Sequence, residues 1–362
     1  MTEQSDLLYS ETEDDLRATV RALLADRAGH QSLLDRIETD DPYVPGLWTS
    51  LAGDIGAAGL LVPEKLGGLG ASHREAAVVL EELGRAVTPL PYLTSAVVAT
   101  ETLLALAGEG GGPAAELLAE LASGRTVAVL VVPLSTAPDQ EPPIAPEVAG
   151  VADAVAADVL LVPRADGLYA VPAGEATVGP QTPLDLTRPL ARVSTPPGGG
   201  IRLAEGDAAR AAVRRGLLAG AGLLASEQLG LAEWCLEETV RHTRERHQFN
   251  RPVGSFQALK HRMAQLWLDV VGARAAARAA ADALATGSPD APLTVAVAQA
   301  YCSKVAVRAA EECVQLHGGI GMTWEHPAHL ALKRAKSDQS ALGSAGRHQD
   351  AIAALMDLPA PR

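Results

Sequence analysis

The hydrophobic pattern of this chain changes its period twice, and that change limits the folds that the chain can adopt. Up to residue 123, apolar residues recur at helical spacing, as they do from Leu16 to Leu24. Between residues 124 and 206, short apolar runs alternate with proline and glycine, which is typical of strands and turns. Helical spacing then returns. The sequence therefore predicts an α+β fold with an N-terminal helical domain at 1–123, a small, shortened middle β domain at 124–206 and a C-terminal helical bundle at 207–362.

Local signals place helices on both sides of the middle region. Ser72 is followed three residues later by Glu75 and then by apolar residues at helical spacing, which predicts a helix that begins with a capping box. Further along, one apolar face extends from Leu217 to Val240 and predicts a single long helix. Further helical patterns follow it. We therefore expect a four-helix bundle that buries its seam against itself or against another copy.

The middle region has the composition of a small β domain. Strands are predicted at residues 127–132, 159–162, 168–171 and 190–193. The turn Asp166-Gly167 predicts a hairpin between the second and third of these strands. Proline and glycine punctuate the other residues from 133 to 205, and no further strand is placed there.

Charge and composition bear on location and on partners. The net charge of −14 argues against binding to nucleic acid or to an anionic membrane. No apolar run has the length of a membrane span, and the acidic, polar segment from Met1 to Asp15 is unlike a signal peptide. Cys235, Cys302 and Cys313 form no CxxC pair. These features predict a cytoplasmic protein with reduced, buried cysteines.

One polar segment between two predicted helices has the residues of an anion site. It runs from Arg244 to Gln257, and Arg244, Arg246 and Arg251 cluster at its turn. Guanidinium groups so placed could hold a diphosphate through paired, charged hydrogen bonds. Arginines near a helix C-terminus also complement the helix dipole. Taken alone, the segment favours that simpler interpretation.

A second segment, from Gln315 to Pro327, follows the end of a helix. Its glycines, Gly318 and Gly319 first among them, allow a backbone to approach an adenine or a phosphate closely. The same glycines are also what an ordinary helix C-cap and turn would use.

Two histidines in this segment raise the question of a metal. His326 and His329 lie three residues apart, beside Glu325. The residue types suit a metal, but no third ligand has a suitable spacing. Ordinary surface histidines explain the pattern better, and no metal site is predicted.

Taken together, the two segments resemble one family. The pattern Arg-x-x-Phe-x-x-Pro-Val-x-x-Phe-Gln, starting at Arg246, precedes the pattern Gln-x-x-Gly-Gly-x-Gly, starting at Gln315. This pair looks like the C-terminal domain of acyl-CoA dehydrogenases, and the early loop from Gly59 to Gly70 resembles that family's early loop. The order of helical, β and helical regions fits as well. The resemblance covers nearly the whole chain and implies the acyl-CoA dehydrogenase fold.

The resemblance also implies a cofactor and a reaction. Members of that family oxidise an acyl-CoA at the Cα–Cβ bond, where a carboxylate removes the α-proton and FAD accepts the β-hydride. The residues implied to contact FAD are Arg246, Phe249 and Gln257 at the pyrophosphate and adenosine, and Gln315, Gly318 and Gly319 at the adenosine end. In this family those residues reach a flavin that a neighbouring subunit mainly holds.

The catalytic carboxylate of the family has no counterpart here. Its usual position falls in the stretch from Ala341 to Ser344, where Leu342 stands, and leucine cannot accept a proton. Some members place the base on the first long helix of the C-terminal domain, at a position that falls near Gly220. Glu227 is the nearest acid and a weak candidate for a displaced base, although a structural role in helix packing explains it better. No catalytic residue is therefore assigned.

The flavin-supporting loop of the family is also missing. A Thr-Glu-Pro-x-x-Gly-Ser-Asp loop should follow the first strand, but the segment from Pro133 to Gln140 is unrelated to it. The aromatic strand that normally packs on the flavin ring is absent as well. A chain without these groups has no evident means of orienting the ring.

These departures resemble one subset of the family, the actinobacterial heterotetramers that act on CoA thioesters of steroid side chains. In those enzymes one chain carries the base and its partner is degenerate. The segment from Gly318 to Pro327 and the stretch from Glu82 to Arg85 look like members of that group. The resemblance implies a non-catalytic subunit of an FAD-dependent oxidoreductase, with a second acyl-CoA dehydrogenase-family chain as partner and an acyl-CoA as substrate.

Two alternatives remain open from the sequence. The chain could be a self-sufficient homomeric acyl-CoA dehydrogenase whose displaced base is Glu227. It could also be a scaffold or acyl-CoA-binding protein without redox function. The flavin content of a co-expressed complex separates the last alternative from the non-catalytic subunit of an FAD-dependent enzyme.

Overall fold

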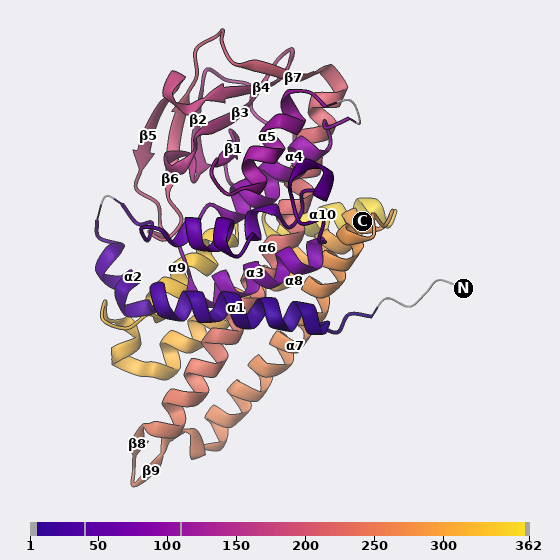
Figure 1. The fold of residues 1–362 in the computed structure, drawn as a ribbon. Helices are drawn as coiled ribbons and strands as arrows, with labels where there is room; N and C mark the ends of the chain where they lie inside the picture. Colours follow the sequence, from indigo (N-terminus) through magenta and orange to yellow (C-terminus); the bar gives the residue numbers. More distant parts are fainter. Residues whose placement is uncertain (1–5, 40, 109–110, 359–362) are drawn as a thin grey trace.

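The computed structural model describes residues 6–39, 41–108 and 111–358, and a small β region lies at one end of its helices (Figure 1). The N-terminal helices are α1 (Glu11–Arg27), α2 (His30–Arg36), α3 (His73–Ala86), α4 (Thr100–Leu104) and α5 (Pro113–Ala122). Two π-helical segments, η1 (Thr49–Asp54) and η4 (Tyr92–Ala99), lie between them. The predicted capping box is confirmed, because the Ser72 amide donates to the Glu75 carboxylate at 2.9 Å and the Ser72 hydroxyl accepts from the first turn of α3.

The middle region forms two sheets. Its strands are β1 (Ala128–Leu130), β2 (Glu147–Ala152), β3 (Val159–Arg164), β4 (Gly167–Pro172), β5 (Thr177–Gln181), β6 (Leu190–Ser194) and β7 (Ile201–Glu205). The first sheet has the order β1-β3-β4-β7, and the second has the order β2-β6-β5. The predicted hairpin is β3–β4, in which Arg164 pairs with Gly167. A shared apolar core that includes Val129, Leu160 and Val193 packs the two sheets together.

Three of these strands, β2, β5 and β7, do not appear in the sequence prediction. The β5 segment contains Gly179 and Pro180, and the β7 segment follows three consecutive glycines. The β2 segment contains Gly150 and a break in its pairing register with β6. Glycine and proline weaken the local strand signal, so pairing with β6 or β4 decides that these segments are strands.

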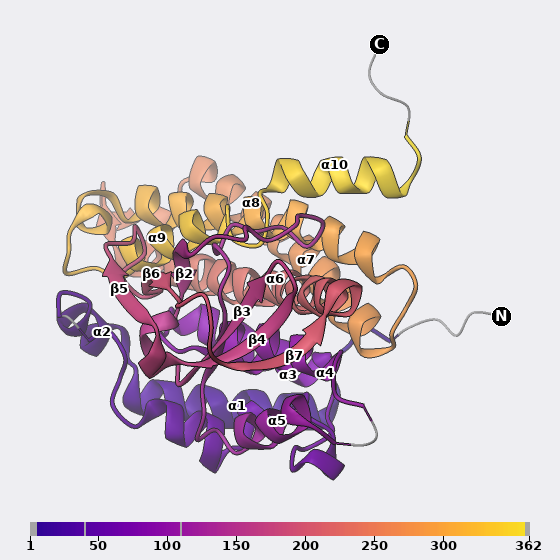
Figure 2. The same ribbon diagram turned by 90° about the horizontal axis from the view of Figure 1, so that it is seen from above.

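The C-terminal region is built around one long helix. Its elements are α6 (Gly206–Glu245), β8 (His247–Gln248), β9 (Arg251–Pro252), α7 (Gln257–Ala285), α8 (Ala291–His317), α9 (Ala328–Asp338) and α10 (Ala345–Leu355). Viewed from above, α6 lies between the N-terminal helices on one side and α8 and α9 on the other (Figure 2). Every residue from 219 to 232 is buried. The middle of α6 is therefore covered on all sides, and the apolar face predicted from the sequence is only one part of its buried surface.

Two glycines let α3 cross α6 at very short range. A Cβ atom on Gly84 would lie 2.0 Å from the Glu227 carbonyl oxygen, and one on Gly230 would lie 1.8 Å from the Glu81 carbonyl oxygen. Neither position accepts a larger residue without moving a backbone. The crossing therefore fixes the rotation of α6 and with it the direction of every side chain on that helix. Within the described residues, no helix is long and apolar enough to span a membrane.

Candidate functional site

The two positions at which the family's base would stand meet at one apolar point. Gly220 belongs to α6, and Leu342 lies in the turn between α9 and α10. A Cβ atom on Gly220 would lie 3.1 Å from Leu342 Cδ1 and 2.5 Å from Val98 Cγ2. Leu342 is only 3% exposed. The structure therefore brings both candidate positions together, and neither supplies an ionisable group there.

Almost no free space remains beside Leu342. The adjoining cavity has a volume of about 30 Å³, which is room for a water molecule or two. Its walls include Val98, Leu217 and Leu342, and none of the residues lining it is ionisable. An acyl chain with a flavin ring stacked on it needs several hundred cubic ångströms. This part of the chain cannot hold both without rearranging.

The loop after β1 closes the same space from the other side. The Leu342 amide donates to the Leu134 carbonyl at 2.7 Å, and the Leu134 amide donates to the Gly150 carbonyl at 2.8 Å. The Leu342 carbonyl lies 3.0 Å from His348 Nε2. In addition, Arg347 pairs with Asp139 of the loop at 2.7 Å. The loop that should cradle a flavin ring is thus bonded to the turn that should carry the base.

Glu227, the weak candidate for a displaced base, is 2% exposed and held by two arginines. Arg334 Nη1 donates to its carboxylate at 2.6 Å, and the Arg188 guanidinium is also bonded to it. Burial works to raise the pKa of Glu227, but the charges of Arg188 and Arg334 outweigh it and hold the pKa below its usual value. A carboxylate that prefers its charged form and is paired with two arginines is a poor proton acceptor.

The sequence analysis missed the rest of this buried charge cluster. Arg334 also binds Asp185 and donates to the Thr187 carbonyl at 2.8 Å. Asp338, one turn further along α9, is fully buried, and neither of its carboxylate oxygens has a hydrogen-bond partner. Burial first and the charge of Glu227 second raise the pKa of Asp338 to about 8. The one local signal in the sequence was the pair Arg334 and Asp338, two charged residues four apart on an otherwise apolar face of α9.

The predicted FAD-contacting residues of the first segment lie at the far tip of α6. The strands β8 and β9 form a hairpin whose two turn residues, Phe249 and Asn250, have φ values of 52° and 58°. The hairpin is the lowest feature in Figure 1. Arg246, at the end of α6, and Gln257, at the start of α7, are exposed, and Phe249 is 84% exposed. None of these side chains is used by the interior of its own chain.

The second predicted segment lies against the same end of α6. The rings of His242 on α6 and His317 on α8 are 4.2 Å apart, and His317 sits between Gln315 and Gly318. Gly318 has a φ of 65° and ends α8, so the turn needs glycine at this point. Gln315, Gly318 and Gly319 are exposed. The structure thus brings the two predicted FAD segments to one end of the bundle.

The tip and the base positions lie far apart on the same helix. Twenty-six residues of α6 separate Gly220 from Arg246, which corresponds to roughly 39 Å along the axis at 1.5 Å per residue. An extended dinucleotide does not cover this distance. The exposed tip therefore cannot serve a flavin ring placed at Leu342 of the same chain.

A larger cavity elsewhere does not suit the expected ligand. It lies between α5 and the first sheet, has a volume of about 490 Å³ and is lined by Glu116, Glu120 and Glu175 among apolar residues. Carboxylates repel the phosphates of a coenzyme A thioester. This cavity therefore carries none of the predicted chemistry.

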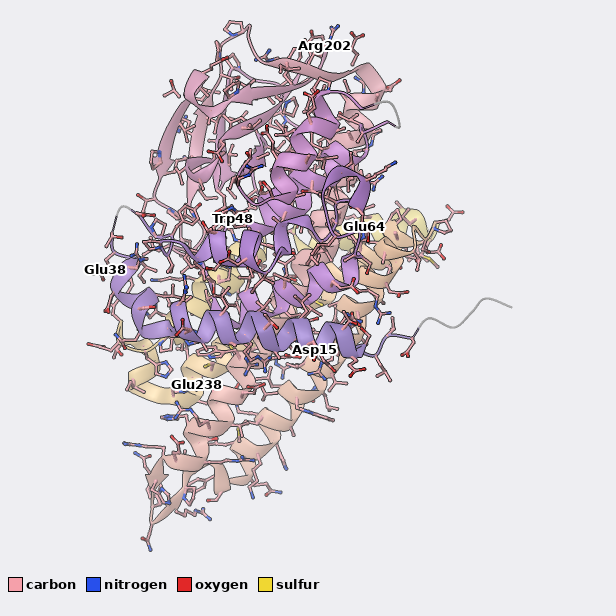
Figure 3. All side chains as sticks on the ribbon, in the orientation of Figure 1. Asp15, Glu38, Trp48, Glu64, Arg202 and Glu238 are labelled. Carbon is pink, nitrogen blue, oxygen red and sulfur yellow. The ribbon has the colours of Figure 1, made fainter. Side chains whose placement is uncertain are left out.

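The histidines set aside as metal ligands separate in the structure. His329 Nε2 faces the Trp324 carbonyl at 3.2 Å, and its ring packs against Trp324. His326 instead approaches His317 and Glu238, which is labelled in Figure 3. The three residues come from separate elements, so sequence spacing gave no signal for the group.

Comparison with known proteins agrees with this architecture. The model of the acyl-CoA dehydrogenase N-terminal domain matches residues 10–124, and that of the C-terminal domain matches residues 210–356. The acyl-CoA dehydrogenase IpdE2 of Mycobacterium tuberculosis is 38% identical over 335 residues, which cover 91% of this chain and 92% of that protein.

Solved structures give the same result at the level of the whole chain. The ChsE4–ChsE5 complex from Mycobacterium tuberculosis matches with a TM-score of 0.85 at 25% identity, over 99% of this chain and 100% of the matched chain. A variant of the Tcur3481–Tcur3483 steroid ACAD matches with a TM-score of 0.82 at 25% identity, over 96% and 98% of the two chains. The sequence matches along nearly the full length, together with this fold, show that the chain belongs to the acyl-CoA dehydrogenase family.

Proposed function

We propose that this chain is the non-catalytic subunit of a hetero-oligomeric, FAD-dependent acyl-CoA dehydrogenase. A second chain of the same family would carry the base and hold the flavin ring. The observation that carries the proposal is the contrast between the buried middle of α6 and its C-terminal end. The middle, at Gly220 and Leu342, is apolar and closed, whereas the C-terminal end, at Arg246, is open, charged and unused by its own chain.

The residues present fit one half of the cofactor. FAD supplies the hydride acceptor of the family's reaction. At the tip, Arg246 would pair with the pyrophosphate, and Phe249 and Gln257 would contact the adenosine side. The turn at Gln315, Gly318 and Gly319 would line the adenosine end. The closed space beside Leu342 does not fit the ring half, so the ring would sit in the partner.

An exposed apolar strip offers a surface for that partner. Trp267, Leu268 and Val271 on α7 are 56%, 55% and 39% exposed. Val297 and Tyr301 on α8 are also exposed, and Tyr301 lies against Gly272 of α7, so the two sets adjoin. A contiguous apolar patch of this kind typically marks a protein interface. We assign its occupant as the second acyl-CoA dehydrogenase-family chain, because the ChsE4–ChsE5 relative is a complex of two chains.

The proposed substrate class follows from the relatives. The Tcur3481–Tcur3483 structure is of a steroid ACAD, so we propose a CoA thioester of a steroid side chain as the substrate of the assembled enzyme. We further propose that the complex works in the cytoplasm.

The proposal is tested by comparing the chain alone with the chain co-expressed with a partner. The partner should be a family member that has glutamate at the position of Leu342. The flavin-to-protein ratio is measured by absorbance, and turnover is measured with an acyl-CoA and an artificial electron acceptor. We expect little flavin and no turnover for the chain alone, and both in the complex.

Two results would contradict the proposal. Yellow, active protein from the single chain would establish a homomeric enzyme, and the effect of Glu227→Gln on its turnover would then show whether Glu227 is the base. A stable complex without flavin would establish a role as a scaffold or acyl-CoA-binding protein.

A further inference from the structure

Three potential ligand side chains converge beside the C-terminal end of α8. Glu238 comes from α6, His317 is the last residue of α8, and His326 precedes α9. Their ligand atoms all lie within 4.8 Å of one another. Glu238 Oε1 is 3.6 Å from His317 Nε2 and 3.8 Å from His326 Nε2. These separations are too long for direct hydrogen bonds.

His317 is held with one ring nitrogen unused. Its Nδ1 donates to the Cys313 carbonyl at 2.6 Å, whereas its Nε2 is buried and has no hydrogen-bond partner. The residue is only 5% exposed. A buried polar atom without a partner is uncommon and needs an explanation. An N–H held by a backbone carbonyl, with the other nitrogen free, is the arrangement of a metal-ligating histidine.

We propose that Glu238, His317 and His326 form a binding site for a divalent transition-metal ion, with zinc as the best-matched ion. Two imidazoles and one carboxylate are a common zinc ligand set that leaves a fourth position for water. Zinc at 2.0–2.1 Å from tetrahedral ligands separates their atoms by about 3.3 Å. The observed 3.6 and 3.8 Å exceed this by only a few tenths of an ångström.

Hydrogen bonds already made by Glu238 and His326 oppose the binding of an ion. Arg241 Nε donates to Glu238 Oε2 at 2.9 Å, and the same guanidinium is bonded to Oε1. Each carboxylate oxygen has two lone pairs, so Oε1 can face both Arg241 and an ion. His326 Nδ1 accepts a 3.2 Å hydrogen bond from the Ala328 amide, which binding at Nε2 would give up.

Protons compete with the ion as well. Burial works to lower the pKa of His317, but Cys313 and Glu238 raise it to about 10. An ion binds only the unprotonated nitrogen, so we expect the affinity for zinc to fall as the pH is lowered.

The site would join the two segments assigned to FAD contact. His317 adjoins Gly318, and Glu238 lies two turns before Arg246 on α6. An ion there would fix the turn after α8 against the end of α6. The inference uses only the geometry of this cluster, so it stands apart from the proposed subunit role.

The test is zinc binding to the full-length, untagged chain after treatment with a chelator. Calorimetry gives the affinity and stoichiometry for zinc, and cobalt serves as the spectroscopic probe of ligand geometry. The variants are Glu238→Gln and His326→Gln, with His329→Gln as the matched control. His329 is a histidine three residues from His326 but lies outside the cluster. Because His317 is buried, its replacement risks misfolding and is left out.

We expect wild type and His329→Gln to bind one equivalent of zinc and to give the visible absorption of four-coordinate cobalt. Glu238→Gln and His326→Gln should weaken binding by at least about tenfold, with unchanged circular dichroism. The inference is overturned if wild type shows no saturable zinc binding. It is equally overturned if both variants bind zinc as the control does.

Discussion

The buried middle of α6 and its C-terminal end differ in burial, charge and openness. Near Gly220 the helix is surrounded by apolar side chains, and the space that a base and a flavin ring would need is filled by Leu342 and the loop after β1. Near Arg246 the helix leaves the core and presents arginines and an 84% exposed phenylalanine to solvent. In the proposed role, the closed middle lacks the groups that a catalytic chain would use itself, and the open C-terminal end carries those that a neighbouring chain would use.

In the proposed role, this difference teaches how a subunit without its own chemistry can still contribute to an enzyme. A buried site with no reactive group is free to fill with well-packed apolar residues, because packing stabilises the fold. An exposed tip gains nothing for its own chain from a left-handed phenylalanine. The proposed contact with FAD held by a partner chain would give this exposed phenylalanine a role.

The largest expected effect is that of Glu227→Gln, in the buried middle of α6. The change removes the counter-charge that Arg188 and Arg334 share in the core, so we expect a loss of about 3–5 kcal/mol in the free energy of unfolding. Urea denaturation measures it. Glu237→Gln, on the same helix but 59% exposed, should change stability by less than about 1 kcal/mol. Equal effects of the two changes would mean that the buried cluster does not hold Glu227 as described.

Placing a glutamate at residue 342 tests whether the space beside Gly220 can open to hold a substrate or is filled by packed side chains. We expect Leu342→Glu to lower stability by about 3 kcal/mol, because it buries a carboxylate among apolar side chains. It should give no dehydrogenation in the chain alone. Leu342→Met keeps the volume and should cost less than about 1.5 kcal/mol. Turnover by the glutamate variant would show that the cavity can open and would break the comparison.

The open end is tested by Arg246→Ala in the co-expressed complex. Loss of a charged hydrogen bond to the pyrophosphate should weaken FAD retention by about 1.5–3 kcal/mol, or tenfold to a hundredfold. Flavin release during dialysis measures it, and Arg125→Ala, a remote exposed arginine, is the control. Unchanged retention in Arg246→Ala would remove the assigned role of the tip.

The pH dependence of stability in Asp338→Asn tests the buried charge cluster around Glu227. The folded-state pKa of Asp338 is raised to about 8, above its unfolded value near 4, so the unfolded chain releases this proton first. The contribution of Asp338 to stability therefore falls as pH rises from about 4 to about 8 and is constant above that. We expect the variant to gain about 1–2 kcal/mol relative to wild type between about pH 7 and pH 9. The same difference in urea midpoint between variant and wild type at both pH values would contradict this expectation.

The smallest expected effect concerns Phe249. Glycine adopts a φ of 52° without strain, so Phe249→Gly should stabilise the isolated chain by roughly 0.5–1 kcal/mol or leave it unchanged. The same change should lower the flavin content of the complex. A thermal melt and a flavin ratio on one preparation separate the two effects. A clear loss of stability in the isolated chain would show that Phe249 serves its own fold.

Local signals in the sequence predicted most of the regular structure. The capping box at Ser72, the hairpin of β3 and β4 and the long helix after residue 207 each follow from residues adjacent in the chain. The strands that were missed, such as β5 with Gly179 and Pro180, depend on pairing with a distant strand. Their own composition argues against them.

The sequence by itself determined the family, the absence of glutamate at residue 342 and the exposed arginines near residue 246. It could not determine that Gly220 and Leu342 meet, that Glu227 is bonded to arginines 39 residues before it and 107 residues after it, or that Glu238, His317 and His326 converge. Motifs and turns depend on neighbours along the chain, and these meetings depend on how α3, α8 and α9 pack around α6. Side-chain contacts between distant segments are set by that packing, and only the tertiary structure contains it.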